Sequence, residues 1–396
     1  MRVSSIKKSS MKSQKRIYQS LFNNKSKKES LSPLSSNFWY ILPVKGEDKE
    51  VDYFSSRWVM DIGQLYKILY VLAILSCACF VIFYLIPYEN SEGETFRAPP
   101  PLVDALDLTI HTNQGRLGNQ MFTYATLFGL SALNKRHMQI KTSNYEVLSK
   151  YFDIQTPVFN EKTFVEINPY SIGNWLKEKD YHIPITSNII KGNVYPTSYT
   201  FFDHVRKEIR EVFRFNPTYR KHAQDVLWGI KRQRPHTKVY VGVHVRRGDY
   251  LSHSRGGWLR GYEGREVDRE YFERAMEYFN FKYDNVTFLA ISDDRDWCRK
   301  NLTDLGIVTT PDSPSAGHDL ALLTECNHTI MSYGTYGFWG GYLGGGEVVY
   351  FADFLKPNTS FVRDYFVYEK MYPTDWIGIS TTKPGFWESY TNPFMT

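Results

Sequence analysis

Two adjacent arginines follow an apolar stretch of the sequence and could bind a diphosphate. The stretch is Val241–Val245, and Arg246 and Arg247 come directly after it, in the run VGVHVRRGDY. A guanidinium is planar and always charged, so it offers paired N–H donors to phosphate oxygens without a metal ion. Alternation along a strand places His244 and Arg246 on one face and Arg247 on the other. The competing interpretation is an ordinary basic pair on the surface at the end of a strand.

Two further loops contain groups that suit an anion. The first is GRLGNQ, in which Gly115 and Gly118 allow a tight turn and a close approach to a ligand, and Asn119 offers an amide. The second holds Ser332 and Thr335, which could cap a helix and also donate to a phosphate. Glycine turns and hydroxyl caps are common, so a purely structural role stays open for each loop.

The acidic pair Asp293 and Asp294 has two interpretations. Paired acids can hold a metal ion in a sugar-nucleotide enzyme, and acids that precede a helix can equally cap it. Because two arginines are available for the phosphates, the sequence favours a site without a metal. The sequence has no His/Cys cluster with zinc spacing and no Gly-x-x-x-x-Gly-Lys-Ser/Thr loop, which argues against a kinase or sulfotransferase built on such a loop.

The elements that must position these groups alternate between strands and helices. Strand patterns cover residues 106–112, 238–245, 285–291, 328–332 and 347–351. Helical patterns cover 121–136, 268–280, 295–302 and 318–326, and a further helix begins and ends within 334–346. Such alternation is typical of parallel sheets with helices on both faces. We expect an α/β fold with two Rossmann-like lobes, 108–236 and 237–396. The second lobe would bind the ligand beyond the carboxyl ends of its strands and carry a C-terminal return segment.

An uncharged apolar run, Ile68–Ile86, predicts a single transmembrane helix. A helix of that length comes close to the roughly 30 Å hydrocarbon core of a bilayer. Basic residues precede the run and acidic residues follow it, so the positive-inside rule places the N-terminus in the cytosol. We expect a largely disordered cytosolic tail at 1–66, a signal-anchor at 67–87 and a stem at 88–107, with the catalytic body in the lumen. A buried core helix and a cleaved signal peptide are the alternatives.

The formal net charge of +6 does not indicate a nucleic-acid partner. The excess of basic over acidic residues lies within residues 1–67, and the remainder of the chain is close to neutral. A body without a basic bias lacks the electrostatic attraction on which nucleic-acid binding depends.

A lumenal body makes several residues candidates for covalent modification. Asn-x-Ser/Thr sequons predict N-glycosylation at Asn285, Asn301, Asn327 and Asn358. Cys298 and Cys326 are the cysteines outside the apolar run, and oxidation is possible in the lumen. A disulfide between these two cysteines is our hypothesis, and two buried thiols are the alternative.

Five segments together resemble the animal galactoside alpha-1,2-fucosyltransferases: GRLGNQM at 115–121, VGVHVRRGDYL at 241–251, ALLTECNHTIM at 321–331, YGTYGFWGGYL at 333–343 and TDWIGI at 374–379. The His-x-Arg-Arg element is shared more widely, with alpha-1,6- and protein-O-fucosyltransferases. The resemblance implies a GT-B-like enzyme of the Golgi, and the predicted anchor would hold it in the Golgi membrane with type II topology. It also implies transfer of L-fucose from GDP-beta-L-fucose to the 2-hydroxyl of a galactose-terminated glycan, with inversion and without a metal or other cofactor. The long tail at 1–60 departs from the family.

The resemblance also implies roles for individual residues. Arg246 would contact the diphosphate, with His244 beside it, and fixed guanidinium groups would stabilise the charge that builds as GDP departs. The remaining donor-binding candidates are Arg116, Gly118, Asn119, Arg247, Asp294, Ser332 and Thr335.

The base that deprotonates the acceptor hydroxyl is less well defined. Asp249 is the first candidate because it follows the arginines, although it could equally turn the chain after Gly248. Glu263 and Glu266 are alternatives. A fucosyltransferase of another linkage and a non-catalytic homologue that binds a sugar nucleotide or a glycan are the competing functions.

Overall fold

A computed structural model of the protein describes residues 105–113, 115–192, 195–251, 257–356, 359, 361–362 and 365–382. The predicted tail, the anchor, most of the stem and the sequon at Asn358 lie outside these residues. Within the described ranges, no helix has the length and apolar character needed to cross a bilayer.

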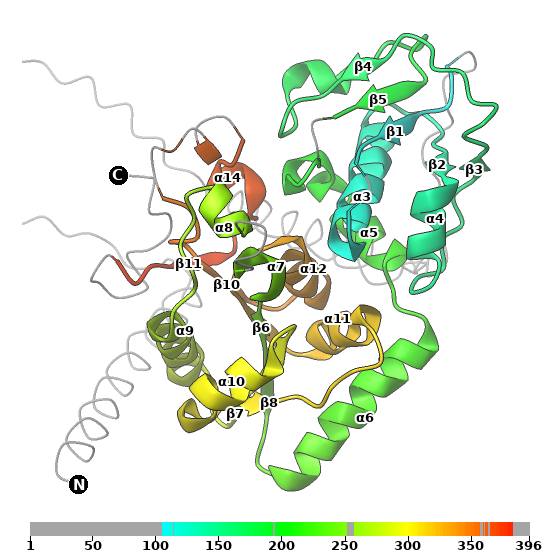
Figure 1. Cartoon of the computed structure of the whole chain (residues 1–396). Helices are drawn as coiled ribbons and strands as arrows, with labels where there is room; N and C mark the ends of the chain where they lie inside the picture. Colours follow the sequence, from blue (N-terminus) through cyan, green and yellow to red (C-terminus); the bar gives the residue numbers. More distant parts are fainter. Residues whose placement is uncertain are drawn as a thin grey trace, which may run out of the picture. The chain divides into compact units, whose positions relative to one another are not determined.

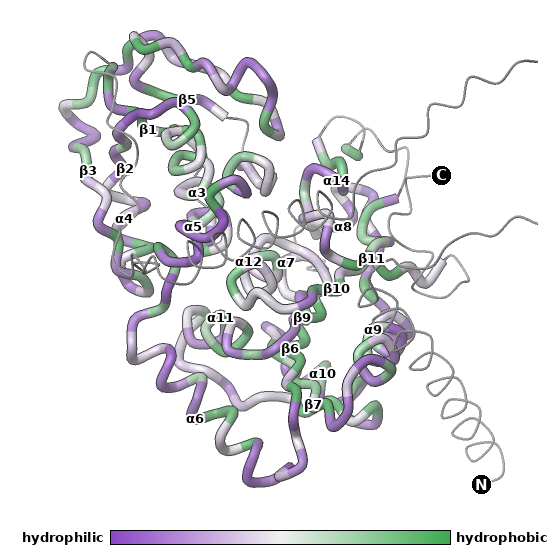
Figure 2. Tube along the Cα trace, turned by 180° about the vertical axis from the view of Figure 1, so that it is seen from behind, coloured by the Kyte–Doolittle hydropathy of each residue, from purple (hydrophilic) through white to green (hydrophobic). Residues whose placement is uncertain are grey.

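The first part of the chain contains short parallel strands around one long helix (Figure 1). Its three-stranded sheet has the order β1-β5-β4, and β2 pairs with β3. The elements are β1 (Thr109–His111), α3 (Leu117–Leu133), β2 (Ile140–Lys141), α4 (Thr142–Leu148), β3 (Val158–Phe159), β4 (Tyr170–Ser171), β5 (Ile189–Lys191) and α5 (Arg206–Val212). The long helix α6 (Pro217–Gln233) then leads to the second sheet and is largely hydrophilic (Figure 2).

The second part is a six-stranded, all-parallel sheet with the order β11-β10-β9-β6-β7-β8. Its strands are β6 (Val239–Val245), β7 (Val286–Ser292), β8 (Val308–Thr309), β9 (His328–Met331), β10 (Val348–Phe351) and β11 (Ile377–Ile379). The chain moves outward from β6 to β8 and then returns to the other side of β6. This is the doubly wound Rossmann order, and ligands bind in such sheets where the direction reverses. Here the reversal lies between β6 and β9.

Helices cover both faces of this sheet, as the alternating sequence pattern predicts. The helices that pack on its strands are α9 (Arg269–Lys282), α10 (Arg295–Leu302), α11 (Ala316–Glu325) and α12 (Thr335–Gly344). The short helices α7 (Gly248–Leu251), α8 (Trp258–Gly261) and α14 (Tyr368–Met371) lie in the connecting segments. Strand β6 is buried along most of its length, which explains its nearly continuous apolar sequence. A Cβ on Gly242 would lie 2.9 Å from Leu323 Cδ2, so this glycine lets α11 pack closely on the strand.

The expectation of an α/β fold with parallel sheets is confirmed. The division at 236/237 remains a prediction, since both sheets belong to one unit of the chain, residues 96–396.

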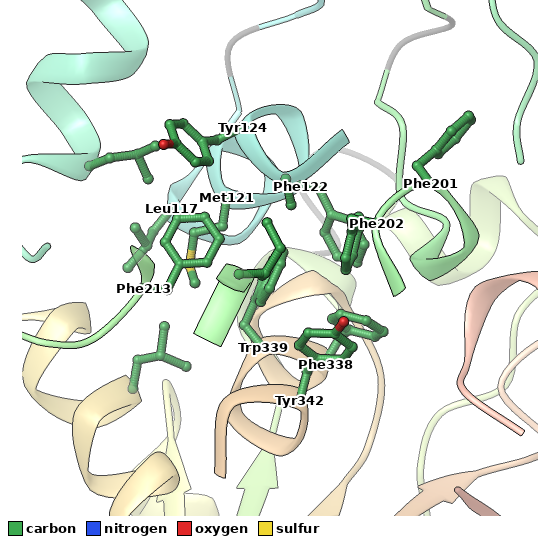
Figure 3. Close-up of a cluster of buried hydrophobic side chains, with 14 of the residues drawn as sticks. Leu117, Met121, Phe122, Tyr124, Phe201, Phe202, Phe213, Phe338, Trp339 and Tyr342 are labelled. Atoms are coloured by element: carbon green, nitrogen blue, oxygen red, sulfur yellow. The ribbon is translucent and has the colours of Figure 1, made fainter. Parts of the chain in front are cut away.

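The largest hydrophobic cluster joins the two sheets through α3 and α12 (Figure 3). The fully buried ring of Trp339, on α12, lies 5.0 Å from Phe122 of α3 and stacks 5.5 Å from Phe202. Its indole Nε1 donates to the carbonyl of Gly118 at 2.9 Å. A buried indole N–H needs a partner, so this bond fixes the ring at the start of α3.

The disulfide hypothesis is wrong in this structure. Cys298, on α10, and Cys326, at the end of α11, are both buried and free. The thiol of Cys326 donates to the carbonyl of Leu322 at 3.3 Å. Burial raises the pKa of Cys298 to about 11 and that of Cys326 to about 12, so both thiols stay protonated and unreactive.

The described sequons differ in accessibility. Asn285 and Asn327 are exposed, whereas Asn301 is half-buried and its Nδ2 donates to the carbonyl of Trp297 at 2.8 Å. Asn327 also fixes the start of β6, because its Oδ1 accepts from the amide of Tyr240 at 2.8 Å. Glycosylation at these positions stays a prediction.

Free thiols can be counted directly. We expect Cys298 and Cys326 to react fully with an alkylating reagent in denaturant without reductant, and to react slowly in the native protein because both are buried. Peptide mapping after alkylation measures this. A disulfide-linked peptide pair in the unreduced sample would contradict the result.

Candidate functional site

Two of the three predicted loops, together with the acidic pair, meet at the carboxyl end of the six-stranded sheet. Arg246 follows β6, Asp293 follows β7 and Ser332 follows β9. The buried hydroxyl of Ser332 accepts from the amide of Arg246 at 2.9 Å, and the amide of Ser332 donates to the carbonyl of His244 at 3.1 Å. Ser332 therefore fastens the loop after β9 to the loop after β6, at the point where the strand order reverses.

Arg246 is held between two carboxylates. One arm of its guanidinium donates to Asp249 and the other to Asp293. The guanidinium also lies 5.7 Å from the ring centroid of Tyr250, and the side chain is 17% exposed. The fork is thus oriented before any ligand arrives, and one N–H of each terminal nitrogen is already engaged.

Arg247 points to the other side of the loop, as strand alternation predicts. Its Nη1 donates to Glu266 at 2.6 Å and its Nε to Asp294 at 3.1 Å. Its guanidinium packs 4.1 Å from the ring of Trp297, a geometry that favours a cation on an aromatic face. With three partners and 14% exposure, Arg247 supports the loop.

The two aspartates of the acidic pair bind different arginine side chains: Asp293 accepts from Arg246 and Asp294 from Arg247. Asp294 caps α10 by accepting from the amide of Trp297 at 3.0 Å, which is one of its two predicted interpretations. Asp293 accepts from the amide of Arg247 at 2.9 Å as well as from the side chain of Arg246. A Cβ on Gly248 would lie 2.4 Å from Asp293 Oδ2, so the glycine makes room for this carboxylate.

The sequence suggested that both arginines would be available to phosphates, but each is paired with carboxylates in the structure. Four carboxylates surround the pair: Asp249, Asp293, Asp294 and Glu266. Asp249 also contacts Arg116 of the glycine loop, with 3.4 Å between the carboxylate and the guanidinium. A diphosphate that uses the same two N–H groups must displace a carboxylate at Arg246.

The starts of α3 and α12 adjoin this group of residues. Thr335 Oγ1 donates to Asn119 Oδ1 at 2.9 Å, and a Cβ on Gly118 would lie 2.7 Å from that same hydroxyl oxygen. The first-turn amides of a helix attract anions, so two helix starts in contact reinforce each other. Gly334 precedes α12 with a φ of +92°, which only glycine adopts without strain.

His244 is buried beneath α12. It is 4% exposed, its Nδ1 has no hydrogen-bond partner among the described residues, and a Cβ on Gly337 would lie 2.5 Å from that nitrogen. Burial, and secondarily the charge of Arg246, lower the pKa of His244 to about 3. The imidazole is therefore neutral at physiological pH.

The candidate bases have different surroundings. Asp249 is shared between Arg246 and Arg116, and Glu266 is paired with Arg247. Glu263 forms no ion pair with any residue that the structure describes, and its backbone adopts a φ of +55°. Among those residues, no group of three or more His, Cys, Asp or Glu side chains is arranged to hold a metal ion.

The structure thus assembles the predicted residues into two adjoining groups. Arg246, Arg247, Asp294 and Ser332 lie at the sheet end, and Gly118, Asn119 and Thr335 lie where α3 meets α12. Arg116 links the groups through Asp249. Sequence reasoning missed the part of Asp293 in holding both arginines, although its place directly after a buried strand was visible.

Comparisons with known proteins match most of the chain. Residues 94–380 match the family described as Glycosyl transferase family 11. The chain is 38% identical over 273 residues to Galactoside 2-alpha-L-fucosyltransferase Sec1 of Mus musculus, covering 67% of this chain and 72% of that protein. It is 37% identical over 297 residues to Galactoside alpha-(1,2)-fucosyltransferase 2 of Bos taurus, covering 74% and 84%.

Solved structures show only a distant likeness. The fucosyltransferase NodZ from Bradyrhizobium has a TM-score of 0.38 and 11% identity, covering 60% of this chain and 93% of that one. POFUT1 in complex with GDP has a TM-score of 0.39 and 10% identity, covering 62% and 98%.

A substitution at Gly118 tests the contact between α3 and α12. We expect Gly118→Ala to lower stability by about 1–3 kcal/mol, because the new methyl would overlap both the hydroxyl and the backbone of Thr335. Gly229→Ala on α6 is the control, since its Cβ would meet nothing within 4 Å, and it should leave stability unchanged or raise it. Thermal unfolding measures both, and equal melting temperatures would contradict the contact.

The buried imidazole predicts a pH dependence. The pKa of His244 is lower in the native state than its ordinary 6.5, so below pH 6.5 the unfolded chain binds a proton that the native state does not. The buried, neutral imidazole of His244 therefore favours the native state fully above pH 6.5, and this contribution to the free energy of unfolding is lost progressively as the pH falls toward 3. From pH 7 to pH 5 we expect a loss of about 2 kcal/mol that His244→Gln lacks. Denaturant unfolding at both pH values checks this, and identical pH slopes would refute it.

Proposed function

Because the chain belongs to glycosyl transferase family 11, we propose that it is a galactoside alpha-1,2-fucosyltransferase. It transfers L-fucose from GDP-beta-L-fucose to the 2-hydroxyl of a terminal galactose and inverts the configuration to give an alpha linkage. The names of its relatives support the donor sugar, the acceptor and the linkage.

The observation that carries this proposal is the place of Arg246. It lies at the carboxyl end of β6, beside the reversal of strand order where parallel α/β sheets bind nucleotides. In our proposal the diphosphate of GDP-fucose takes over the guanidinium from Asp249 and Asp293. The starts of α3 and α12 add helix dipoles and amide donors.

The chemical step then depends on fixed charge. As the bond between fucose C1 and the phosphate oxygen breaks, negative charge grows on the departing GDP. A guanidinium already oriented by its neighbours stabilises that charge without reorganising. The galactose 2-hydroxyl attacks C1 from the opposite face and loses its proton to a base.

Asp249 suits the role of base because the diphosphate, on binding Arg246, displaces the Asp249 carboxylate from that guanidinium. In the unliganded site it accepts from Arg246, and loss of that partner leaves an oxygen available for a proton. Glu263 is the alternative, as an exposed carboxylate without an ion pair to any residue that the structure describes.

We extend the proposal to the cellular setting and to the whole fold. Residues 67–87 anchor the protein in the Golgi membrane as a type II protein, with residues 88–107 as a stem and the catalytic part in the lumen. The two sheets act as the lobes of a GT-B-like enzyme, and the guanidinium groups replace the metal ion that other sugar-nucleotide enzymes use. The uncharged run Ile68–Ile86 and the arginine pair support these statements.

The function is tested with the full-length protein in detergent, GDP-fucose and a terminal beta-galactoside, in a buffer that contains EDTA. We expect GDP release coupled to a product whose NMR spectrum shows an alpha linkage to the galactose 2-position. Absence of transfer to any galactoside would overturn the proposal, and a different linkage would replace it with another fucosyltransferase activity.

Within that assay, Arg246→Lys separates charge from geometry. Lysine keeps the positive charge but cannot offer two parallel donors, so we expect kcat/KM to fall by about two to three orders of magnitude. Arg220→Lys on α6 is the control, because Arg220 pairs only loosely with Glu325, at 3.6 Å, on the surface. Near wild-type turnover in Arg246→Lys would mean that the diphosphate binds elsewhere.

A further inference from the structure

Four aromatic side chains form a continuous stack beside the proposed donor site. Trp258 of α8 stacks on Tyr262 with 5.4 Å between ring centroids and 19° between planes. Tyr262 lies 4.0 Å from Phe361, which lies 5.9 Å from Tyr365. The outer rings remain open to solvent, with Trp258 48% and Tyr365 51% exposed. The stack thus joins segments about a hundred residues apart without being closed into the core.

The stack is connected to the site by direct packing. Helix α8 packs on α7, which directly follows the arginine pair, and the two helices adjoin in Figure 1. At Gly257, which precedes Trp258, a Cβ would lie 2.7 Å from the carbonyl oxygen of Tyr250. The ring of Tyr250 is the one beneath the guanidinium of Arg246.

A second connection reaches the glycine loop. The ring of Tyr195 lies against Gly115, where a Cβ would be 2.9 Å from its Cε1. Burial raises the pKa of Tyr262, and the phenol of Tyr195 raises it further, so the two phenols interact electrostatically. The stack therefore packs beside the arginine loop and lies within electrostatic range of the tyrosine that contacts the glycine loop.

The outer ring has the chemistry of a sugar platform. An exposed indole held in place from behind offers a flat apolar face with an N–H donor at its edge. A pyranose presents a matching apolar face of C–H groups, with hydroxyls around its rim. Arg260 and Glu263 follow Trp258 in the chain and are both exposed, so they offer charged groups of the kind that bond to sugar hydroxyls.

We propose that Trp258, supported by Tyr262 and Phe361, forms the acceptor subsite, on which the terminal galactopyranose stacks while its 2-hydroxyl faces the donor. This inference rests on the proposed fucosyltransferase function and adds where the acceptor binds. Trp258 is thereby a specificity-determining residue, because a sugar must offer an apolar face to the indole to be held for transfer.

The test compares Trp258 with a second exposed tryptophan. Trp228 on α6 is 62% exposed and precedes the opposite, amino-terminal end of β6. With full-length protein, we expect Trp258→Ala to raise the KM for the galactoside about tenfold or more. The KM for GDP-fucose and the slow hydrolysis of GDP-fucose without acceptor should stay within twofold of wild type. Trp228→Ala should match wild type in all three.

Two further variants distinguish the effect of a flat aromatic face at position 258 from the effect of apolar volume alone. Trp258→Tyr should recover most of the acceptor affinity, whereas Trp258→Leu, which keeps apolar bulk without a flat ring, should not. If Trp258→Ala unfolds, the comparison of Trp258→Tyr with Trp258→Leu is sufficient to test the acceptor subsite. Equal KM values for the acceptor in these two variants would overturn the inference. An unchanged galactoside KM in Trp258→Ala, or equal losses for donor and acceptor, would also overturn it.

The wild-type assay distinguishes the inference from the function on which it rests. Transfer by the wild type with a normal acceptor KM in Trp258→Ala would refute the subsite alone. Absence of transfer by the wild type would refute the function. In that case, saturation-transfer NMR of a beta-galactoside with wild type and Trp258→Leu still reports whether the sugar binds at the indole, and equal signals would refute the subsite as well.

Discussion

The close approach of α12 to α3 is the constraint on which the rest of the site depends. It requires a glycine at position 118, because a single methyl there would overlap Thr335. The hydrogen bond from Trp339 to the Gly118 carbonyl and the buried aromatic rings around it hold the two helices at that distance. Since α3 belongs to the first sheet and α12 to the second, this one contact decides where the glycine loop lies relative to Arg246.

The same packing explains the unusual state of His244. A residue at the end of β6 would normally reach solvent, but the first turn of α12 covers it and leaves one ring nitrogen without a partner among the described residues. An unpaired buried nitrogen is tolerable only while the ring is neutral. The imidazole therefore acts as a packing surface beneath the helix, next to an arginine whose charge further disfavours its protonation.

Much of the second sheet could be predicted from the sequence, because its strands are apolar, regularly spaced and separated by recognisable helices. The strands of the first sheet are only two or three residues long, too short to show a period, and apart from the first they escaped prediction. The arginine pair was visible, but a sequence does not say which acid on a neighbouring strand reaches it, so the part of Asp293 emerged only in three dimensions. The disulfide hypothesis failed because an oxidising compartment does not bring two cysteines together, and Cys298 and Cys326 belong to different hydrophobic clusters. The aromatic stack was missed because Trp258 and Phe361 are distant in the chain.

The carboxylates that occupy Arg246 also bear on selectivity among anions. An inorganic phosphate or sulfate offers the guanidinium little beyond charge, and two aspartates in hydrogen-bond contact already supply that. Such an ion would have to separate these pairs, and apart from the amides at the starts of α3 and α12 it has few groups to contact. A ligand that also carries a base and a sugar makes contacts along its whole length, which offset the cost of the exchange. The resting ion pairs therefore favour an extended ligand over a small anion.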